Sequence, residues 1–458
     1  MSKTPAPSGQ TPSSGPERPT FAALLLYASG QLGWSLAAYG VGNLLIYFYM
    51  PPETGKAIFP SFIFQGAVLG VFTLIGILSA AGRFFDAVLD PVVANWSDRS
   101  KARSGKRRWF LLRGALPFAL FATLVFFPPN ASESATNFVW LAVCLGAYFF
   151  FFAFYVIPYT ALIPELGHSA EDRMRISTLL SVAWALGFIA GNSAYALQAY
   201  FEQSGKNPVE AFQQAQLLLN GAALIFMLIP ALLLRENRYA RQAPSEHRLK
   251  DALSIVLGNR NFRVFLGSDL MYWLSLNFIQ LGIGYYVTLL LGLDKANAFT
   301  FSLISFLSSF VFYAPVMWLE KRFGKSIMIQ TAFWIFIGLF AVVGLARLVP
   351  LDKMLLLYLL GVVAAWPLAV FGILPNALIG DVVEQEEKSS GRQLAGMFFG
   401  VRAFVMKAGI SLANLVFPSL LLLGRSTDNP AGVQLTTVIA IVFSLAGWLM
   451  FRRFREAT

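Results

Sequence analysis

The chain has 458 residues, of which 57% are hydrophobic and only 13% are charged, whereas a soluble domain averages about 25% charged residues. This composition excludes a soluble globular protein and predicts a polytopic membrane protein. The net charge of +11 comes from basic residues between apolar runs, so it indicates membrane topology and not binding of nucleic acid. The single cysteine, Cys144, excludes an internal disulfide, and the two histidines lie in polar segments, which excludes a histidine metal site inside the membrane.

Residues 1–20 are rich in proline, serine and threonine, which predicts a disordered tail without signal-peptide features. Twelve apolar stretches follow, each long enough to cross a bilayer as a helix. They are residues 21–49, 66–96, 107–128, 137–163, 176–201, 212–234, 262–291, 298–319, 326–349, 354–380, 394–423 and 433–452. A charged linker, residues 235–261, separates a first half (21–234) from a second half (262–454). We therefore expect an all-α membrane protein with two halves of six helices.

The distribution of basic residues predicts the orientation of these helices. Loops that follow the even-numbered stretches, together with both tails and the ends of the stretches that border them, hold 25 of the 35 lysine and arginine residues, and the other loops with their bordering ends hold six. This asymmetry predicts that both termini and the linker are cytoplasmic. The two halves also repeat a charge pattern: Asp98 and Glu320 follow stretches two and eight, and Glu165 and Asp381 follow stretches four and ten. Such a repeat is typical of the major facilitator architecture.

The charged loops between stretches suggest a cytoplasmic gate. Acidic and basic groups at helix ends can form ion pairs between the two halves and lock the cytoplasmic side while the outside is open. The alternative is that they only form solvated loops that set topology. The residues that we expect in this gate are Asp98, Arg99, Arg103, Glu165, Glu320 and Asp381.

Two acids and a base inside apolar stretches point to an ion path. Asp86 and Asp90 are spaced i, i+4, so both carboxylates lie on one face of a helix, with Arg83 one turn earlier. Charges within the membrane are costly and usually mark an ion or substrate path, and two converging carboxylates favour a small cation. Lys407, inside stretch eleven, can pair with these acids when no cation is bound, or it can extend to the interface. The alternative for the acids is a structural ion pair with Arg83.

Three segments, in order, resemble the signature of the glycoside–pentoside–hexuronide:cation symporters. They are Gly82–Gly105, with its Arg-x-x-Asp-x-x-x-Asp-Pro core, Tyr155–Glu165, and residues 377–407. The resemblance implies that Asp86 and Asp90 bind the coupling ion, Na⁺ or H⁺, and that Lys407 faces them. It further implies a plasma-membrane transporter that moves a sugar or glycoside with a monovalent cation by alternating access. A lysolipid or other amphipathic substrate, and uncoupled transport, remain alternatives.

Neither an enzyme nor a cofactor is expected, because the sequence has no nucleotide-binding motif or catalytic constellation. The substrate positions depart from the galactoside-transporting members of the resembled family: two acids are replaced by Ser35 and Val156, and a stacking tryptophan by Thr160. Asp269 is either a second protonatable group or, as we prefer, the partner of Arg263 or of a loop residue. The substrate-binding candidates that we rank first are Trp34, Ser35, Tyr39, Tyr155, Tyr159 and Thr160; the others are Gln31, Asn43, Trp184, Asn192, Tyr272, Asn277, Gln280 and Trp366.

Overall fold

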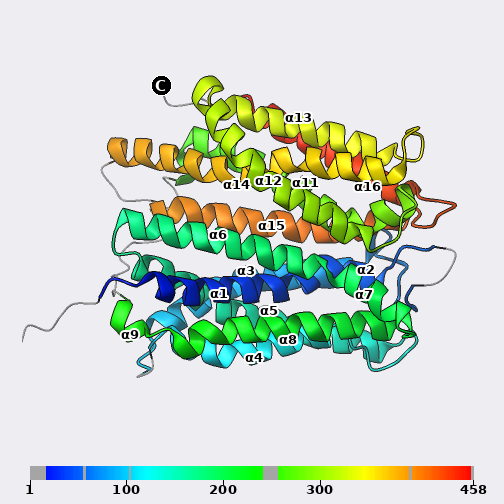
Figure 1. Ribbon diagram of the computed structural model, residues 1–458, viewed down its shortest axis with the longest axis horizontal. Coiled ribbons are helices and arrows are strands. Elements are labelled where there is room, and N and C mark those ends of the chain that lie inside the picture. The colour runs from blue at the N-terminus through cyan, green and yellow to red at the C-terminus, as the bar shows by residue number, and fades with distance from the viewer. Residues whose placement is uncertain (1–16, 55–57, 103–104, 241–255, 391–394, 455–458) are drawn as a thin grey trace, which may run out of the picture.

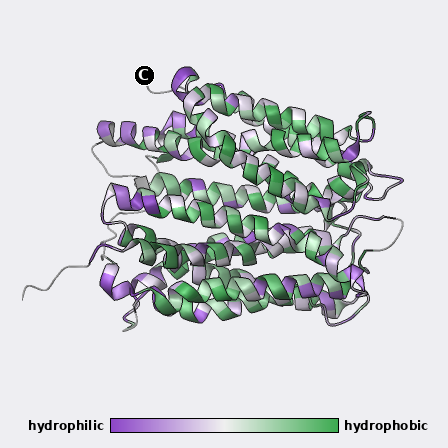
Figure 2. Ribbon diagram, viewed as in Figure 1, coloured by the Kyte–Doolittle hydropathy of each residue, from purple (hydrophilic) through white to green (hydrophobic). Residues whose placement is uncertain are grey.

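The computed structural model describes residues 17–54, 58–102, 105–240, 256–390 and 395–454. Long helices run side by side along the long axis of the molecule (Figure 1). Hydrophobic residues cover their length, and hydrophilic residues gather at the two ends of the bundle (Figure 2). The described chain starts and finishes at the same end, which we call the terminal end; the other is the distal end.

The first half contains the first six predicted apolar stretches. Its elements are α1 (Phe21–Tyr39), the π-helix η1 (Gly40–Leu44), α2 (Leu45–Tyr49), β1 (Ala67–Val68), β2 (Phe72–Thr73), α3 (Leu74–Asp98), α4 (Arg108–Leu124), α5 (Ala135–Leu166), α6 (Ala170–Asn192), α7 (Ala194–Gln203) and α8 (Pro208–Leu233). The short helix α9 (Glu236–Tyr239) follows at the terminal end. Residues 1–16 of the predicted tail and 241–255 of the predicted linker lie outside the described residues.

The second half repeats this plan. Its elements are α11 (Arg260–Tyr285), the π-helix η2 (Tyr286–Leu290), α12 (Asn297–Phe323), α13 (Lys325–Gly344), α14 (Lys353–Ser390), α15 (Ala395–Leu421) and α16 (Ala431–Phe451). A π-helical turn thus lies in the first long helix of each half near the distal end: η1 joins α1 to α2, and η2 ends α11. Such turns frequently occur at functional sites in helices.

Ten helical segments of the described chain are long and apolar enough to cross a membrane. The other two long helices are α4, which has only 17 residues, and α3, which carries Arg83, Asp86 and Asp90. The predicted start of the second stretch at Gly66 is wrong. A β-hairpin turns at Leu69 and Gly70, both with positive φ, and the helix begins at Leu74, where the Thr73 side chain accepts a hydrogen bond from the Gly76 backbone.

Packing within each half is more extensive than packing between halves. In the first half α1 packs on α6 and α8, and α4 packs on α5 and α8; in the second, α11 and α13 pack on α16, and α12 packs on α14. The main contact between halves is α3 along α15, and a smaller one joins α6 and α7 to α12. The α3–α15 contact places the second predicted stretch, which carries Asp86 and Asp90, opposite the eleventh, which carries Lys407.

Candidate functional site

The charges of α3 and α15 meet between the two halves. Lys407 Nζ lies 2.9 Å from Asp86 Oδ2 and 2.5 Å from Asp90 Oδ2. The i, i+4 spacing on α3 turns both carboxylates to the same face, and one turn further along α15 the Ser411 hydroxyl donates a hydrogen bond to the Ala80 carbonyl. The Asp86 side chain is fully buried, and that of Asp90 is 29% exposed. One ammonium therefore bridges two carboxylates across the interface.

Several oxygens of this cluster have no hydrogen-bond donor in the described part of the chain. They are both carboxylate oxygens of Asp86, Oδ1 of Asp90 and the Ser79 hydroxyl, all on α3 and all buried. Asp86 Oδ2 is close to Lys407 Nζ, but as an ion pair and not as an aligned hydrogen bond. Buried oxygens without donors are costly, and hard cations prefer oxygen ligands. These oxygens are thus suitable ligands for a small cation.

Arg83 does not belong to the ion pair. Its guanidinium lies 5.4 Å from the centre of the Phe149 ring, and it forms no ion pair with Asp86 or Asp90 within the described residues. The Arg83 guanidinium lies close to Gly42 in η1, because a Cβ atom at Gly42 would be 3.1 Å from Arg83 Nη2. The alternative that Arg83 pairs with the acids is therefore wrong in this structure.

A cavity of about 360 Å³ lies between α1 and α6 of the first half and α11, α12, α14 and α15 of the second. Its volume falls in the range of ~300–1,000 Å³ that is typical of small-molecule sites. Four of our substrate candidates line it: Gln31, Trp184, Tyr272 and Gln280.

The six candidates that we ranked first lie outside the lining of this cavity. The hydroxyls of Tyr155 and Tyr159 donate to the carbonyls of Met227 and Tyr27, inside the first half. Those of Ser35 and Thr160 donate to carbonyls of their own helices. The ring of Trp34 packs against Phe152, and Tyr39 lines an adjoining apolar pocket of about 30 Å³. Trp34, Tyr155 and Tyr159 thus face the core of their own half, whereas Tyr39 also meets residues of the second half.

Arg402 lines the cavity and was missed as a site residue. It makes a two-pronged ion pair with Asp269: Nε and Nη2 lie 2.8 and 3.0 Å from the two carboxylate oxygens. Our expectation that Asp269 pairs with Arg263 or a loop residue is therefore wrong. The signal was in the sequence, since Arg402 and Asp269 are opposite charges within two apolar stretches.

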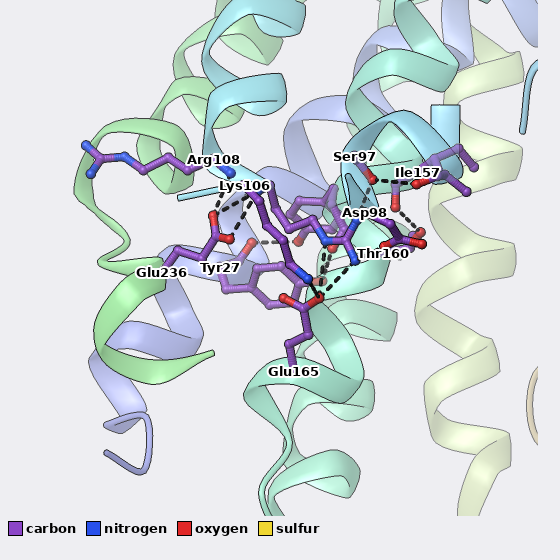
Figure 3. A network of polar contacts seen from close by, with 12 residues as sticks. Tyr27, Ser97, Asp98, Lys106, Arg108, Ile157, Thr160, Glu165 and Glu236 are labelled. Atoms are coloured by element: carbon purple, nitrogen blue, oxygen red, sulfur yellow. Dashed lines mark hydrogen bonds and ion pairs between the residues drawn. The ribbon is translucent and has the colours of Figure 1, made fainter. Parts of the chain in front are cut away.

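A second charged network lies at the terminal end of the first half (Figure 3). Arg107, which precedes α4, lies 2.5 Å from Asp98 and 2.9 Å from Glu165, and also bonds to the Ser97 hydroxyl. The Glu236 carboxylate accepts hydrogen bonds from the backbone N–H groups of Arg107 and Arg108, so α9 caps the start of α4.

The fit of Glu236 into this network is close. Burial raises the pKa of its carboxyl, although the two backbone hydrogen bonds oppose the shift. Gly105 adopts φ +110°, and a Cβ atom there would lie 2.4 Å from Glu236 Oε2. Only glycine suits both the backbone and the space.

The predicted gate residues do not join the halves at the terminal end in this structure. Asp98 and Glu165 pair with Arg107 of their own half, and Asp381 pairs with Lys325 of its own half at 2.5 Å. Arg99 and Glu320 form no ion pair within the described ranges, and Arg103 lies outside them. Because the gate is expected when the outside is open, its formation in that state stays a prediction.

At the distal end, ion pairs do cross between the halves. Lys295 Nζ lies 2.5 Å from Glu202 Oε1, and Arg425 Nη2 lies 2.8 Å from Glu53 Oε1. Glu53 and Ser426 also form a short parallel β-bridge, and the Tyr285 hydroxyl donates to the Met50 carbonyl at 2.5 Å. The two halves are thus held together at the distal end.

Comparison with known proteins agrees with this architecture. A relative from Escherichia coli K12, the putative glycoside/cation symporter YagG, is 24% identical over 82% of this chain and 81% of its own length. The isoprimeverose transporter of Lactiplantibacillus pentosus is 23% identical over 78% of this chain and 74% of its own length. The crystal structure of a D-xylose-proton symporter superposes with a TM-score of 0.67 at 15% identity, covering 95% of this chain and 97% of that one, which shows a common fold.

The family model described as MFS/sugar transport protein matches residues 26–454, nearly the whole chain. The predicted major facilitator fold, the resemblance to the glycoside–pentoside–hexuronide:cation symporters and the exclusion of an enzyme are confirmed. The chain is a membrane transporter that belongs to the MFS/sugar transport protein family.

Proposed function

We propose that the protein is a symporter that couples the entry of Na⁺ or H⁺ to the uptake of a small glycoside or related organic solute. The observation that carries this proposal is the Lys407 bridge: an ammonium of one half lies between Asp86 and Asp90 of the other. A cation that binds the two acids can replace this ammonium as their counter-ion. The names of the relatives support a sugar-like solute, since they include a glycoside/cation symporter and an isoprimeverose transporter.

The cation can take the place of Lys407 without new ligands. The unpaired oxygens of Asp86, Asp90 and Ser79 lie on one helix, and release of Lys407 also frees Oδ2 of Asp90. A proton needs only one of these carboxylates, whereas Na⁺ uses several oxygens. Substrate then binds in the 360 Å³ cavity. We further propose an inner-membrane location with the terminal end in the cytoplasm, because the loops at that end hold most of the basic residues.

The alternating-access cycle follows from where the halves are joined. In this structure the links across the interface lie at the distal end and at Lys407, so the distal end is closed. Opening to the outside requires that the distal pairs separate. A ligand shifts such an equilibrium only by its differential affinity for the two states. Cation and substrate therefore act together by stabilising the same state.

Asp90→Asn tests the proposal. Uptake of a radiolabelled glycoside into membrane vesicles is measured with an imposed Na⁺ or proton gradient and without one. We expect the variant to lose gradient-driven accumulation while it retains downhill transport, because the cation site is lost and the cavity is intact. Full accumulation by Asp90→Asn would show that the coupling cation binds elsewhere.

A further inference from the structure

The large cavity carries a single charged side chain among its described lining residues, and that side chain is Arg402. The rest of the lining is neutral, with amides and hydroxyls of Gln31, Gln280 and Ser309 and with aromatic rings. Rings from both halves contribute, including Trp184 of α6 and, in the second half, Tyr272, Tyr313 and Phe371. A ligand in this cavity thus meets aromatic faces and one cation.

Arg402 is held in place by its neighbours. Asp269 takes the Nε and Nη2 donors, and the Asn376 side chain accepts from Nη1 at 2.8 Å. These bonds use three of the five guanidinium N–H groups, so one remains on each terminal nitrogen. The Asp269 side chain is 3% exposed and that of Arg402 is 14% exposed, so the acid lies behind and the base faces the cavity. A donor that is already ordered loses little entropy when a ligand binds.

We propose that Arg402 is a specificity-determining residue that binds an acidic group of the substrate, so that the cavity takes an amphipathic organic anion with a carboxylate at Arg402 and a ring against the aromatic wall. The inference rests on the proposed function, whose cavity it uses. The planar guanidinium fork matches a carboxylate, and hydrogen bonds between charged groups are the strongest that a side chain makes.

The charge balance of the interior favours the same ligand. Arg83 and Lys407 balance Asp86 and Asp90, and Arg402 balances Asp269. A bound coupling cation therefore leaves one uncompensated positive charge within the membrane, where charges are costly. A substrate carboxylate restores neutrality in the loaded transporter.

The test uses a matched pair of probes, phenyl β-D-glucuronide and phenyl β-D-glucoside, which differ only by a carboxylate in place of a hydroxymethyl group. Binding to the purified protein is measured by calorimetry at neutral pH with saturating Na⁺. We expect the glucuronide to bind about tenfold or more tightly than the glucoside, as a hydrogen bond to a charged group implies. Glucuronic acid, which lacks the phenyl group, is expected to bind more weakly than phenyl glucuronide.

Variants locate the preference. Arg402→Gln is expected to abolish it, and Arg402→Lys to reduce it because the fork is lost. Arg402→Gln also leaves Asp269 buried without a partner, so the double variant Arg402→Gln/Asp269→Asn is measured to preserve the fold. The control Arg113→Gln, which removes an exposed arginine that stacks on Trp109, is expected to keep the preference.

Equal binding of the two probes, no binding of either, or a preference that survives in the double variant would overturn the proposal. The symport proposal fails separately, because it depends on cation-driven accumulation and on Asp90. A transporter that accumulates neutral glycosides in an Asp90-dependent way without favouring the glucuronide would retain the proposed function and refute the role of Arg402.

Discussion

Lys407→Met removes the ammonium that bridges two carboxylates within the membrane and leaves an unbranched side chain of similar length. Asp86 is fully buried, with Lys407 Nζ 2.9 Å from its Oδ2. Removal of one partner from a buried ion pair costs about 3–5 kcal/mol, because the other charge is left uncompensated. Asp90 is 29% exposed, so it adds no more than the ~1 kcal/mol of a solvated pair. We therefore expect the free energy of unfolding to fall by about 3–5 kcal/mol, mostly because of Asp86.

The assay is reversible unfolding in mixed micelles at neutral pH without Na⁺, followed by tryptophan fluorescence. A double-mutant cycle with Asp86→Asn isolates the pair, and the double variant is expected to regain most of the loss because no unpaired charge remains at position 86. Lys388→Met is the matched control. It breaks an exposed i, i+4 pair with Glu384, whose side chains are 74% and 67% exposed, and should cost about 0.5 kcal/mol or less.

Two results would refute this reasoning. The first is an unchanged free energy of unfolding in Lys407→Met at neutral pH. The second is a double variant that is no more stable than Lys407→Met alone. Either result would mean that Asp86 is neutral or solvated in the absence of Lys407. The loss of Lys407 would then leave no uncompensated buried charge.

Two further predictions concern the ends of the bundle. Lys295→Ala removes the distal ion pair with Glu202 and is expected to increase the outward-open population about fivefold. The population is measured by the rate at which a cysteine introduced in the cavity is labelled from outside. Glu202→Ala should have the same effect, and an unchanged labelling rate would exclude a gating role for this pair. Glu236→Ala removes the cap of α4 and should cost about 1 kcal/mol of stability. Because burial raises the pKa of Glu236, the contribution of this carboxyl to the free energy of unfolding is largest below the ordinary pKa of 4.5 and declines as pH rises through the raised pKa. Unfolding curves measured over a series of pH values should lose that decline in Glu236→Gln. An unaltered pH profile would contradict this prediction.

The sequence predicts those features that depend on local periodicity. Helical spacing alone puts Asp86 and Asp90 on one face, and apolar length alone indicates the membrane helices. The start of α3 was misplaced because Gly66–Thr73 is as apolar as a helix, and only the positive φ angles at Leu69 and Gly70 distinguish the hairpin. The hydropathy of a segment carries no information about such a turn of the backbone.

The features that depend on helix rotation were not predictable in the same way. Tyr155 and Tyr159 were candidates by position along the helix, but they face Met227 and Tyr27 within the first half. The pairing of Arg402 with Asp269 requires α15 to pack on α11, a contact between segments that are 133 residues apart. A search for opposite charges in different apolar stretches would have proposed it, since a buried charge needs a partner.

The ion pairs that join the two halves share one polarity. In each of them, among the described residues, the acid belongs to the first half and the base to the second: Glu53–Arg425, Glu202–Lys295 and the pairs of Asp86 and Asp90 with Lys407. Attraction across the interface therefore holds the distal and central parts together, whereas the charges at the terminal end are satisfied within each half. In the symport that we propose, a cation at the central acids replaces Lys407 and removes the link nearest the proposed substrate cavity. The remaining distal pairs are partly solvated and weaker, so loss of the central bridge lowers the barrier to opening on the distal side. In this proposal, a single lysine couples cation binding to the change of access.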